Sequence, residues 1–329
     1  MDADNVVLQV KDLHTHFFHR EGVTKSVNGV NLGLKQGRVL GLVGESGSGK
    51  TMTALSIMQL VPYPGRIVQG EVIYQGKDLL KTDKDAMRKI RGKEISIVFQ
   101  DPTTSLNPVI PVGTQIEEML TSHLPISKSQ AREGAINSLR RVGMPDAERI
   151  ISQYPFQLSG GMAQRVMLAI ALSLQPKVLI ADEPTSNLDV TLQAEILLQL
   201  KMLKQEEKAA ILLITHDLGV IAQMADEVAV MYAGSIVEFG DLLTIFKRPT
   251  HPYTWALLQA VARLDRPDKE LTPLRGAPPS LLDLPDQCAF IPRCNKARNE
   301  CRLGPRPPLV EIEPHHYVAC YNPIRHDWD

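Results

Sequence analysis

Residues 44–51 read GESGSGKT, a glycine followed by four residues and then Gly49-Lys50-Thr51. This is the spacing of a phosphate-binding loop, in which glycines let backbone N–H groups curl around a polyphosphate without Cβ clashes. A short apolar run at 38–43 precedes the loop, and helical spacing begins at Thr51. The loop therefore joins a strand to a helix whose N-terminal dipole favours an anion. A glycine-rich turn that merely fits the pattern is the alternative, and this context argues against it.

An acidic pair follows a second apolar run, KVLIADE at 177–183. The run predicts a buried strand, and Asp182 lies near its carboxyl end, where ligands gather in open α/β sheets. Asp182 is a candidate for holding Mg²⁺, and Glu183 is a candidate base toward an attacking water. A strand that simply ends in solvated acidic residues is the alternative explanation of this segment alone.

Predicted strands and helices alternate along much of the chain. Strands are expected at 6–10, 26–34, 38–43, 178–182, 211–215, 227–231 and 236–238, and helices at 51–60 and 192–205. The stretch from about 84 to 175 reads as mostly helical. This alternation predicts an α/β fold whose sheet is at least partly parallel.

Composition narrows the class of protein. An apolar content of 43% in 329 residues allows a sizeable core, and a net charge of -1 gives no sign of nucleic-acid binding. No stretch approaches the roughly 20 apolar residues of a membrane helix. The first residues, MDADNVVLQV, lack the apolar region of a secretory signal. We expect a cytosolic protein that reaches a membrane only through a partner.

Further motifs complete a recognisable set. They are LSGGMAQR at 158–165, Gln100 within IVFQDPTTSLNP, the turn Asn187-Leu188-Asp189, and His216 within LLITHD. With the phosphate loop and the acidic pair, their order and spacing resemble the ABC ATPase family. The turn reads SNLD rather than SALD and the signature ends MAQR rather than QQQR, which are mild departures.

The resemblance covers residues from about 6 to 245 and implies a P-loop ABC ATPase. The implied fold is a RecA-like mixed sheet core with a helical subdomain at about 100–175. The implied cofactors are ATP and Mg²⁺. By position, Glu183, His216 and Gln100 match the family's catalytic residues, and Thr51, Gln100 and Asp182 match its Mg²⁺ ligands.

The family's nucleotide contacts are carried over residue by residue. They match Phe17, Gly44, Glu45, Ser46, Gly47, Ser48, Gly49, Lys50, Thr51, Thr53, Ser159, Gly160, Gly161, Gln164 and Asp189. Phe17 resembles the aromatic that stacks on adenine, with His16 and Phe18 as neighbouring candidates and a core phenylalanine as the alternative. Ser159–Gly161 resemble the helix start that faces the γ-phosphate of the opposite subunit, so the resemblance implies an active site shared by two ATPase subunits.

The branch of the family is indicated by VFQDPTTSLNP, by HPYT at 251–254, and by a tail with four cysteines. These resemble the dipeptide/oligopeptide importer branch; a proline-stiffened entry into a helix is a compatible explanation of HPYT. We expect an ATPase domain at 1–246 and an extension at 247–329. The implied cargo is di- or oligopeptides, with nickel, glutathione or another small solute as the alternative.

The resemblance also implies partners and location. It places the chain at the cytoplasmic face of the cell membrane, with two transmembrane permease subunits. A second, non-identical ATPase subunit and an extracytoplasmic solute-binding protein complete the implied assembly, and no nucleic acid takes part.

The cysteines, Cys288, Cys294, Cys301 and Cys320, all lie in the tail and lack the close C-x2-4-C pairs of small zinc sites. Four thiolates suit an iron–sulfur cluster, and members of this branch carry a [4Fe–4S] cluster there. Zinc and uncoordinated thiols remain the alternatives. Neighbouring arginines, Arg293, Arg302 and Arg306, either offset the cluster's charge or are simply solvated.

Other functions are weighed against a transporter ATPase. ABC ATPases that act on DNA or ribosomes tend to have two cassettes in one chain or a long inserted coiled coil, and this chain has one phosphate loop and no long heptad run. A structural subunit with an inactive site is disfavoured because Glu183 and His216 are present. Exporters usually fuse the cassette to membrane helices, which favours import here.

Overall fold

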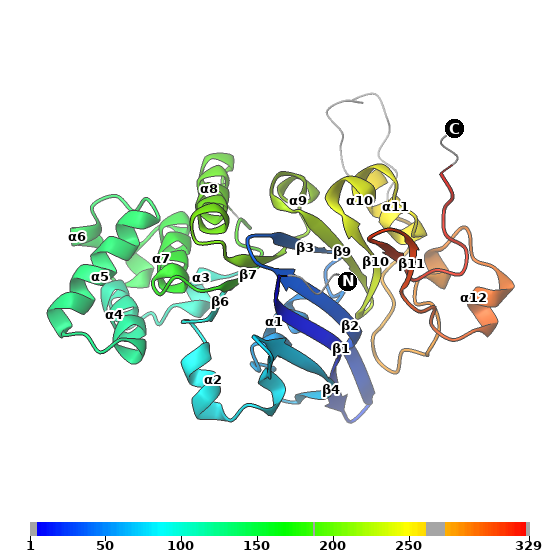
Figure 1. Ribbon diagram of the computed structural model, residues 1–329, viewed down its shortest axis with the longest axis horizontal. Coiled ribbons are helices and arrows are strands. Elements are labelled where there is room, and N and C mark those ends of the chain that lie inside the picture. Colours follow the sequence, from blue (N-terminus) through cyan, green and yellow to red (C-terminus); the bar gives the residue numbers. More distant parts are fainter. Residues whose placement is uncertain (1–4, 187, 261–273, 327–329) are drawn as a thin grey trace. The chain divides into compact units, whose positions relative to one another are not determined.

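The fold is described from a computed structural model, which covers residues 5–186, 188–260 and 274–326 (Figure 1). The chain divides into two compact units. The first unit comprises Met1–Leu34, Val39–Leu80 and Ile214–Asp329, and the second comprises Lys35–Arg38 and Lys81–Leu213. The expected domain boundary after residue 246 stays a prediction, and the residues on either side of it share the first unit.

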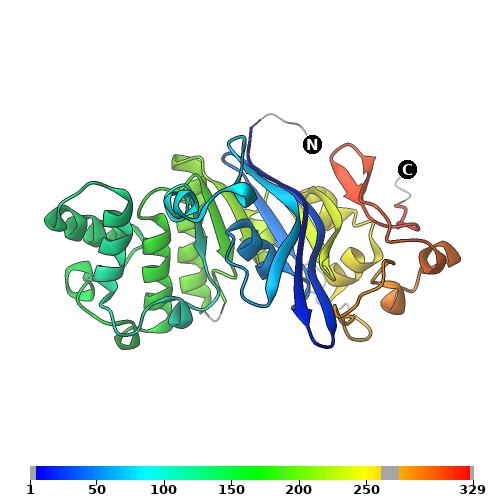
Figure 2. The same cartoon turned by 90° about the horizontal axis from the view of Figure 1, so that it is seen from below.

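The first unit contains an antiparallel sheet with the strand order β2-β1-β4-β5. Its strands are β1 (Val6–His19), β2 (Gly22–Lys35), β4 (Gly65–Tyr74) and β5 (Lys77–Asp78). Leu8, Val10 and Leu13 are buried along β1, and Leu8 pairs with Tyr74 of β4. Figure 2 shows β1 and β2 as one long hairpin in blue. Side chains of a strand alternate between its two faces, so apolar residues two apart line one side.

The same unit holds a mixed set of strands in the order β11-β12-β10-β9-β3. They are β3 (Val39–Val43), β9 (Glu227–Tyr232), β10 (Ser235–Asp241), β11 (Val310–Glu313) and β12 (His316–Val318). β3 runs parallel to β9, whereas β10 is antiparallel to both β9 and β12. β3 and β9 are buried along their whole length, as strands covered on both faces must be. The tail therefore adds its strands to those of the preceding segment.

Helices and short turns complete the first unit. They are α1 (Lys50–Ile57), η1 (Leu79–Lys81), α9 (Leu218–Met224), α10 (Leu242–Lys247), α11 (Pro252–Gln259), η3 (Ile291–Arg293) and α12 (Asn299–Leu303). α11 begins at the proline of HPYT, with His251 as its N-cap. Proline is favoured at a first helical position because its missing N–H would have no helical partner there.

The second unit contains β6 (Ile95–Val98), β7 (Val178–Asp182) and β8 (Ala210–Ile214), with β7 between the other two. β6 and β7 are parallel, and Val98 pairs with Ala181. The helices of this unit are α2 (Lys84–Ile90), α3 (Pro102–Ser105), α4 (Val112–His123), α5 (Lys128–Arg141), α6 (Ala147–Ile150), η2 (Pro155–Gln157), α7 (Gly160–Leu172) and α8 (Val190–Glu206). Figure 1 shows α4, α5, α6 and α7 gathered together, which is the expected helical subdomain.

The α/β class and the P-loop ATPase arrangement predicted from the sequence are confirmed, although the strands β4, β5, β6, β11 and β12 were not expected. β6 interrupts the stretch that reads as helical, because a run of four residues is too short to give a periodic signal. β4 is also unexpected, since its first five residues mix polar and apolar side chains and none of them is buried. Among the described residues, no helix combines the length and the apolar character that crossing a membrane requires.

Candidate nucleotide site

The phosphate loop leaves the buried strand β3 and enters α1 in the first unit. Gly49 is the N-cap of α1, with a left-handed φ of 107° that favours glycine. A Cβ at Gly49 would overlap the carbonyl oxygen of Ser26, and one at Gly44 would overlap that of Met231. Glycine is therefore required at both positions, because backbone lies where a side chain would begin.

The residues of the loop fit a bound polyphosphate. Lys50 Nζ donates to the carbonyl oxygens of Gly44 and Glu45, at 2.8 and 3.0 Å, so its charge stays over the loop. The Ser48 hydroxyl is buried and has no hydrogen-bond partner within the described part of the chain. A Cβ at Gly47 would lie more than 4 Å from every other part of the chain that the structure describes. A phosphate oxygen would satisfy the Ser48 hydroxyl, as buried polar groups require.

The remaining loop positions differ in exposure. Ser46 and Thr51 are exposed, so the Thr51 hydroxyl is available as an oxygen ligand of Mg²⁺. Thr53 is fully buried and donates from Oγ1 to the Gly49 carbonyl at 3.0 Å. Thr53 thus supports the first turn of α1, and its assignment as a nucleotide contact stays a prediction.

His216 lies near the loop's own strand in the first unit. The Thr215 N–H donates to the Leu42 carbonyl of β3 at 3.4 Å, and His216 is the next residue. Asp217 then caps α9 by accepting from the N–H groups of Gly219 and Val220. His216 is exposed between these two anchored neighbours, at the end of β3 where the phosphate loop begins.

The second unit brings together the acidic pair and Gln100. Parallel pairing of β6 with β7 places their carboxyl ends at one edge. Asp182 ends β7, and Glu183 follows it with a left-handed φ of 50°. Such conformations are uncommon for residues with side chains and cluster at functional sites. The Gln100 carbonyl accepts from the Ser186 hydroxyl at 3.4 Å, which links the loop after β6 to the turn after Glu183.

The signature motif forms the exposed start of α7. The Ser159 hydroxyl caps the helix by accepting from the Met162 N–H at 3.3 Å. Gly160 is exposed, and a Cβ there would have no neighbour within 4 Å in the described ranges, whereas a Cβ at Gly161 would overlap the Leu192 side chain of α8. The bare N-terminus of α7 is a favourable place for an anion.

Two further predicted contacts have structural roles in the second unit. Gln164 is 3% exposed and donates from Nε2 to the Pro184 carbonyl at 2.8 Å, so it fixes the turn that follows Glu183. Asp189 is the N-cap of α8 and accepts from the N–H groups of Thr191 and Leu192, each at 3.0 Å. Their contact with nucleotide stays a prediction. Asn187, quoted above in the same turn, lies outside the described residues.

The adenine-stacking candidate lies on β1. The Phe17 ring is half-buried and stacks on His19, with 6.4 Å between centroids. Phe18 is 45% exposed, with the Arg66 guanidinium over its ring. His16 Nε2 is buried without a hydrogen-bond partner in the described part of the chain. Burial lowers the pKa of His16, which favours a neutral imidazole.

Glu45 of the phosphate loop is held by residues far along the chain. Its N–H donates to the Tyr253 hydroxyl at 2.9 Å, and its carboxylate pairs with Arg293. No signal in the sequence indicates this relationship, and Arg293 was expected to be solvated or to offset the charge of a cluster. The Arg293 side chain is only 4% exposed. No local pattern could have found the pair, because its members lie 248 positions apart in the sequence.

The four cysteines of the tail lie around one small cavity, which Phe290 and Tyr321 also line. All four are free thiols. Burial raises the pKa of the Cys288 and Cys294 thiols, and it raises that of Cys320 to about 12. Backbone N–H groups already point at sulfur, from Arg298 to Cys301 and from Asn322 to Cys320. Within the described ranges, no group of three or more His, Cys, Asp or Glu is placed to hold a single metal ion.

These features define a P-loop ATPase of the ABC type: a glycine loop after a buried strand, an acidic pair at a strand end, and a serine-glycine helix start. A family model described as "ABC transporter" matches residues 27–186, and one described as "Oligopeptide/dipeptide transporter, C-terminal region" matches 237–301. The chain is 46% identical to the oligopeptide transport ATP-binding protein OppD of Salmonella typhimurium, over 97% of this chain and 95% of that protein. It is 47% identical to the dipeptide transport ATP-binding protein DppD of Bacillus subtilis, over 88% of this chain and 86% of that one.

Solved structures agree with this class. The dimeric structure of MJ0796, a bacterial ABC transporter cassette, has a TM-score of 0.65 and 28% identity, and covers 71% of this chain and 98% of that one. The structure of a post-hydrolysis state of MJ0796 bound to ADP and Pi also has a TM-score of 0.65. The chain belongs to the ATP-binding subunits of ABC transporters, in the oligopeptide and dipeptide branch.

Proposed function

We propose that this chain hydrolyses ATP to drive the import of di- or oligopeptides through partner permease subunits, at the cytoplasmic face of the membrane. The observation that carries the proposal is the phosphate loop, with its obligatory glycines and its buried Ser48 hydroxyl, which has no hydrogen-bond partner among the residues that the structure describes. The relatives' names, which state oligopeptide or dipeptide transport, support the choice of cargo.

In this proposal the loop's N–H groups and Lys50 hold the β- and γ-phosphates. Thr51, Asp182 and Gln100 supply oxygen ligands for Mg²⁺, which when bound neutralises charge on the transferring phosphoryl group. Glu183 accepts a proton from the attacking water, and its strained backbone fixes the direction of its carboxylate. His216 contacts the γ-phosphate from the end of the loop's own strand.

A second ATPase subunit completes the site. The exposed start of α7, with Ser159 and Gly160, offers N–H groups to the γ-phosphate held by that partner. Asp189 lies in the adjoining turn, and Leu192 links α8 to Gly161 within this chain. ATP joins the two subunits, and hydrolysis lets them separate. The proposed assembly has a non-identical ATPase, two permeases and an extracytoplasmic binding protein.

The tail is proposed to hold a [4Fe–4S] cluster. Support comes from the convergence of four thiols on one cavity, from their soft sulfur chemistry and from backbone N–H groups aimed at sulfur. Single-ion zinc binding is less well supported, since no described group is spaced for it. A bound cluster would cross-link Cys288, Cys294, Cys301 and Cys320. The cross-link would stabilise a segment that has few apolar residues of its own.

The test is reconstitution of the full chain with its partner subunits in proteoliposomes. Vanadate-sensitive ATP hydrolysis and uptake of labelled di- and oligopeptides are expected together, and Lys50→Ala should abolish both by weakening nucleotide binding. Uptake of nickel or glutathione instead of peptide would reject the proposed cargo but not the ATPase. Unchanged ATP affinity in Lys50→Ala would reject the assignment of the loop.

A further inference from the structure

We propose that the C-terminal extension sets the shape and charge of the phosphate loop by gripping Glu45, which makes Arg293 and Tyr253 positioning residues for ATP binding. The inference rests on the proposed function in one respect, that ATP binds at this loop. It goes beyond that function by giving the tail a direct part in nucleotide affinity.

The first part of the grip is a forked ion pair. Arg293 Nη1 donates to Glu45 Oε2 at 2.6 Å, and Nη2 donates to Oε1 at 2.9 Å. Two further hydrogen bonds orient the guanidinium. Nε donates to the Arg275 carbonyl at 2.9 Å, and Nη1 also donates to the Tyr232 hydroxyl at 3.3 Å. The hydrogen bonds with Glu45 raise the pKa of Arg293 above its usual range. Two-pronged pairs of this kind fix geometry as well as charge.

The second part of the grip is the Tyr253 hydroxyl, which accepts the Glu45 N–H. Tyr253 is 0% exposed, and its ring lies against Tyr232 and Phe290, with centroids 4.5 and 5.5 Å away. A ring packed in this way cannot swing away from the loop. Both the backbone and the carboxylate of Glu45 are therefore held by residues of the extension.

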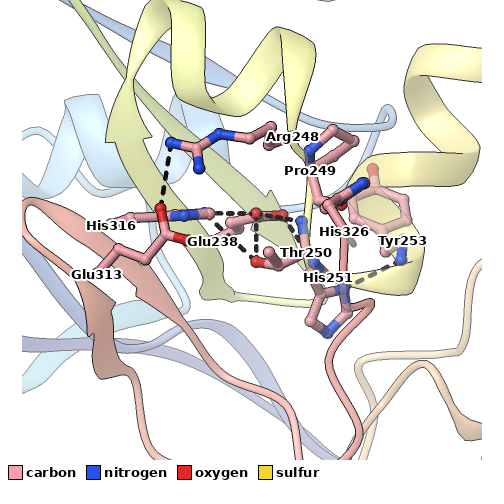
Figure 3. A network of polar contacts seen from close by, with 9 residues as sticks. All are labelled: Glu238, Arg248, Pro249, Thr250, His251, Tyr253, Glu313, His316 and His326. Atoms are coloured by element: carbon pink, nitrogen blue, oxygen red, sulfur yellow. Dashed lines mark hydrogen bonds and ion pairs between the residues drawn. The ribbon is translucent and has the colours of Figure 1, made fainter. Parts of the chain in front are cut away.

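The position of Tyr253 is itself fixed through the buried carboxylate of Glu238 (Figure 3). Glu238 of β10 is 0% exposed and accepts from Thr250 N–H at 2.6 Å, Thr250 Oγ1 at 2.7 Å and His251 N–H at 2.9 Å. His316 Nε2 lies 2.8 Å from the same carboxylate. His251 Nδ1 then accepts from the Tyr253 N–H at 3.0 Å and starts α11. The HPYT segment is thus fixed to the strand that precedes it, which fixes the position of Tyr253.

The grip matters for ATP because Glu45 is the second residue of the loop. Its carboxylate would repel the polyphosphate if it were free to turn inward, and Arg293 both neutralises it and holds it in place. The carbonyl oxygens of Gly44 and Glu45 also accept from Lys50 Nζ. Movement of Glu45 would therefore move the lysine that binds phosphate.

The experiment measures the dissociation constant of a fluorescent ATP analogue with Mg²⁺, on the purified full chain. Arg293→Gln should weaken binding about tenfold, which corresponds to about 1.4 kcal/mol. The matched control is Arg302→Gln, an exposed arginine of the same tail, which should bind as the wild type does. Tyr253→Phe keeps the ring and removes the acceptor, and should weaken binding about threefold.

A double variant separates the effect of the unpaired Glu45 charge from a loss of folding. Adding Glu45→Gln to Arg293→Gln removes the unpaired carboxylate, so ATP affinity should recover most of the loss. If Arg293→Gln binds ATP as Arg302→Gln does, or if the double variant stays as weak as Arg293→Gln, the proposal is overturned. A wild-type chain that binds no MgATP would instead overturn the proposed function, so the two failures are distinguishable.

Arg293→Lys, which retains the charge without the two-pronged hydrogen bonding, should give an intermediate affinity. This variant covers the case in which Arg293→Gln fails to fold.

Discussion

The guanidinium of Arg293 holds both carboxylate oxygens of Glu45, a residue 248 positions earlier in the phosphate loop. Arg293 lies directly before Cys294, and Phe290, which packs on Tyr253, lies two residues after Cys288. The thiol-bearing tail and the nucleotide loop are therefore parts of one packed region of the first unit. The tail cannot be treated as an independent appendage.

Removing the buried anchor of this region should destabilise the chain strongly. Glu238→Ala leaves the N–H groups of Thr250 and His251 without their acceptor, and we expect a loss of about 3–5 kcal/mol in the free energy of unfolding. The matched control is Glu313→Ala, which breaks an exposed pair with Arg248 and should cost less than about 1 kcal/mol. Urea unfolding measures both, and equal losses would contradict the assigned role of Glu238.

Stability should fall in mild acid because of His251. Burial lowers the pKa of His251 from 6.5 to about 4 in the folded chain, although the nearby Glu238 carboxylate acts in the opposite direction. Between pH 6.5 and about pH 4, His251 is protonated in the unfolded chain but neutral in the folded chain. The folded chain therefore loses stability as the pH falls through this range. From pH 7 to pH 5 the loss should be about 2 kcal/mol.

The control for this pH dependence is His251→Asn. Asparagine can still cap α11 through its side-chain oxygen but does not titrate. The nearby titratable groups remain in both proteins: Glu238 accepts from the His251 N–H, His316 lies against the same carboxylate, and Cys288 lines a cavity together with His251. The variant should therefore lack most of the His251 contribution between pH 7 and pH 5. Identical pH dependence in the two proteins would show that His251 is not the titrating group.

Two adjacent glycines of the signature motif should behave differently. Gly161→Ala places a methyl group against Leu192 and should cost about 1–3 kcal/mol of stability. A methyl group in Gly160→Ala has no neighbour within 4 Å among the described residues, so stability should change by less than about 0.5 kcal/mol. The added methyl lies where the partner's nucleotide is proposed to bind, so ATP-dependent pairing should weaken. Thermal melts and light scattering with ATP distinguish the two; full pairing by Gly160→Ala would argue against the shared site.

The proposed iron–sulfur cluster at the four cysteines can be tested by the colour and the iron content of the protein. Protein purified without oxygen should be brown and contain iron, and Cys301→Ser should lose the colour because one of the four thiolate ligands is gone. Chelation of the iron should expose all four thiols to a thiol reagent. Zinc without iron in elemental analysis would reject the cluster.

The sequence was sufficient to predict the elements that depend on local pattern. The phosphate loop, β7 and α8 were found within a few residues because glycine spacing and apolar runs are local signals. The positions of Glu238, Tyr253 and Arg293 could not be found in this way. Glu238 lies in SIVEFGD between Val237 and Phe239, where an acidic residue suggests a solvent-facing side chain, yet the folded chain encloses it among donors from two later segments. Such burial depends on contacts that only the complete fold creates.

The most direct test of the account is turnover by Glu183→Gln in the assembled transporter. The variant keeps the shape of the side chain but cannot accept a proton from water. It should bind MgATP as tightly as the wild type, hydrolyse it at least about 100-fold more slowly, and hold the two ATPase subunits together. Hydrolysis at the wild-type rate, with subunits that do not remain paired, would contradict the central claim that this chain is an ATP-driven motor acting through Glu183.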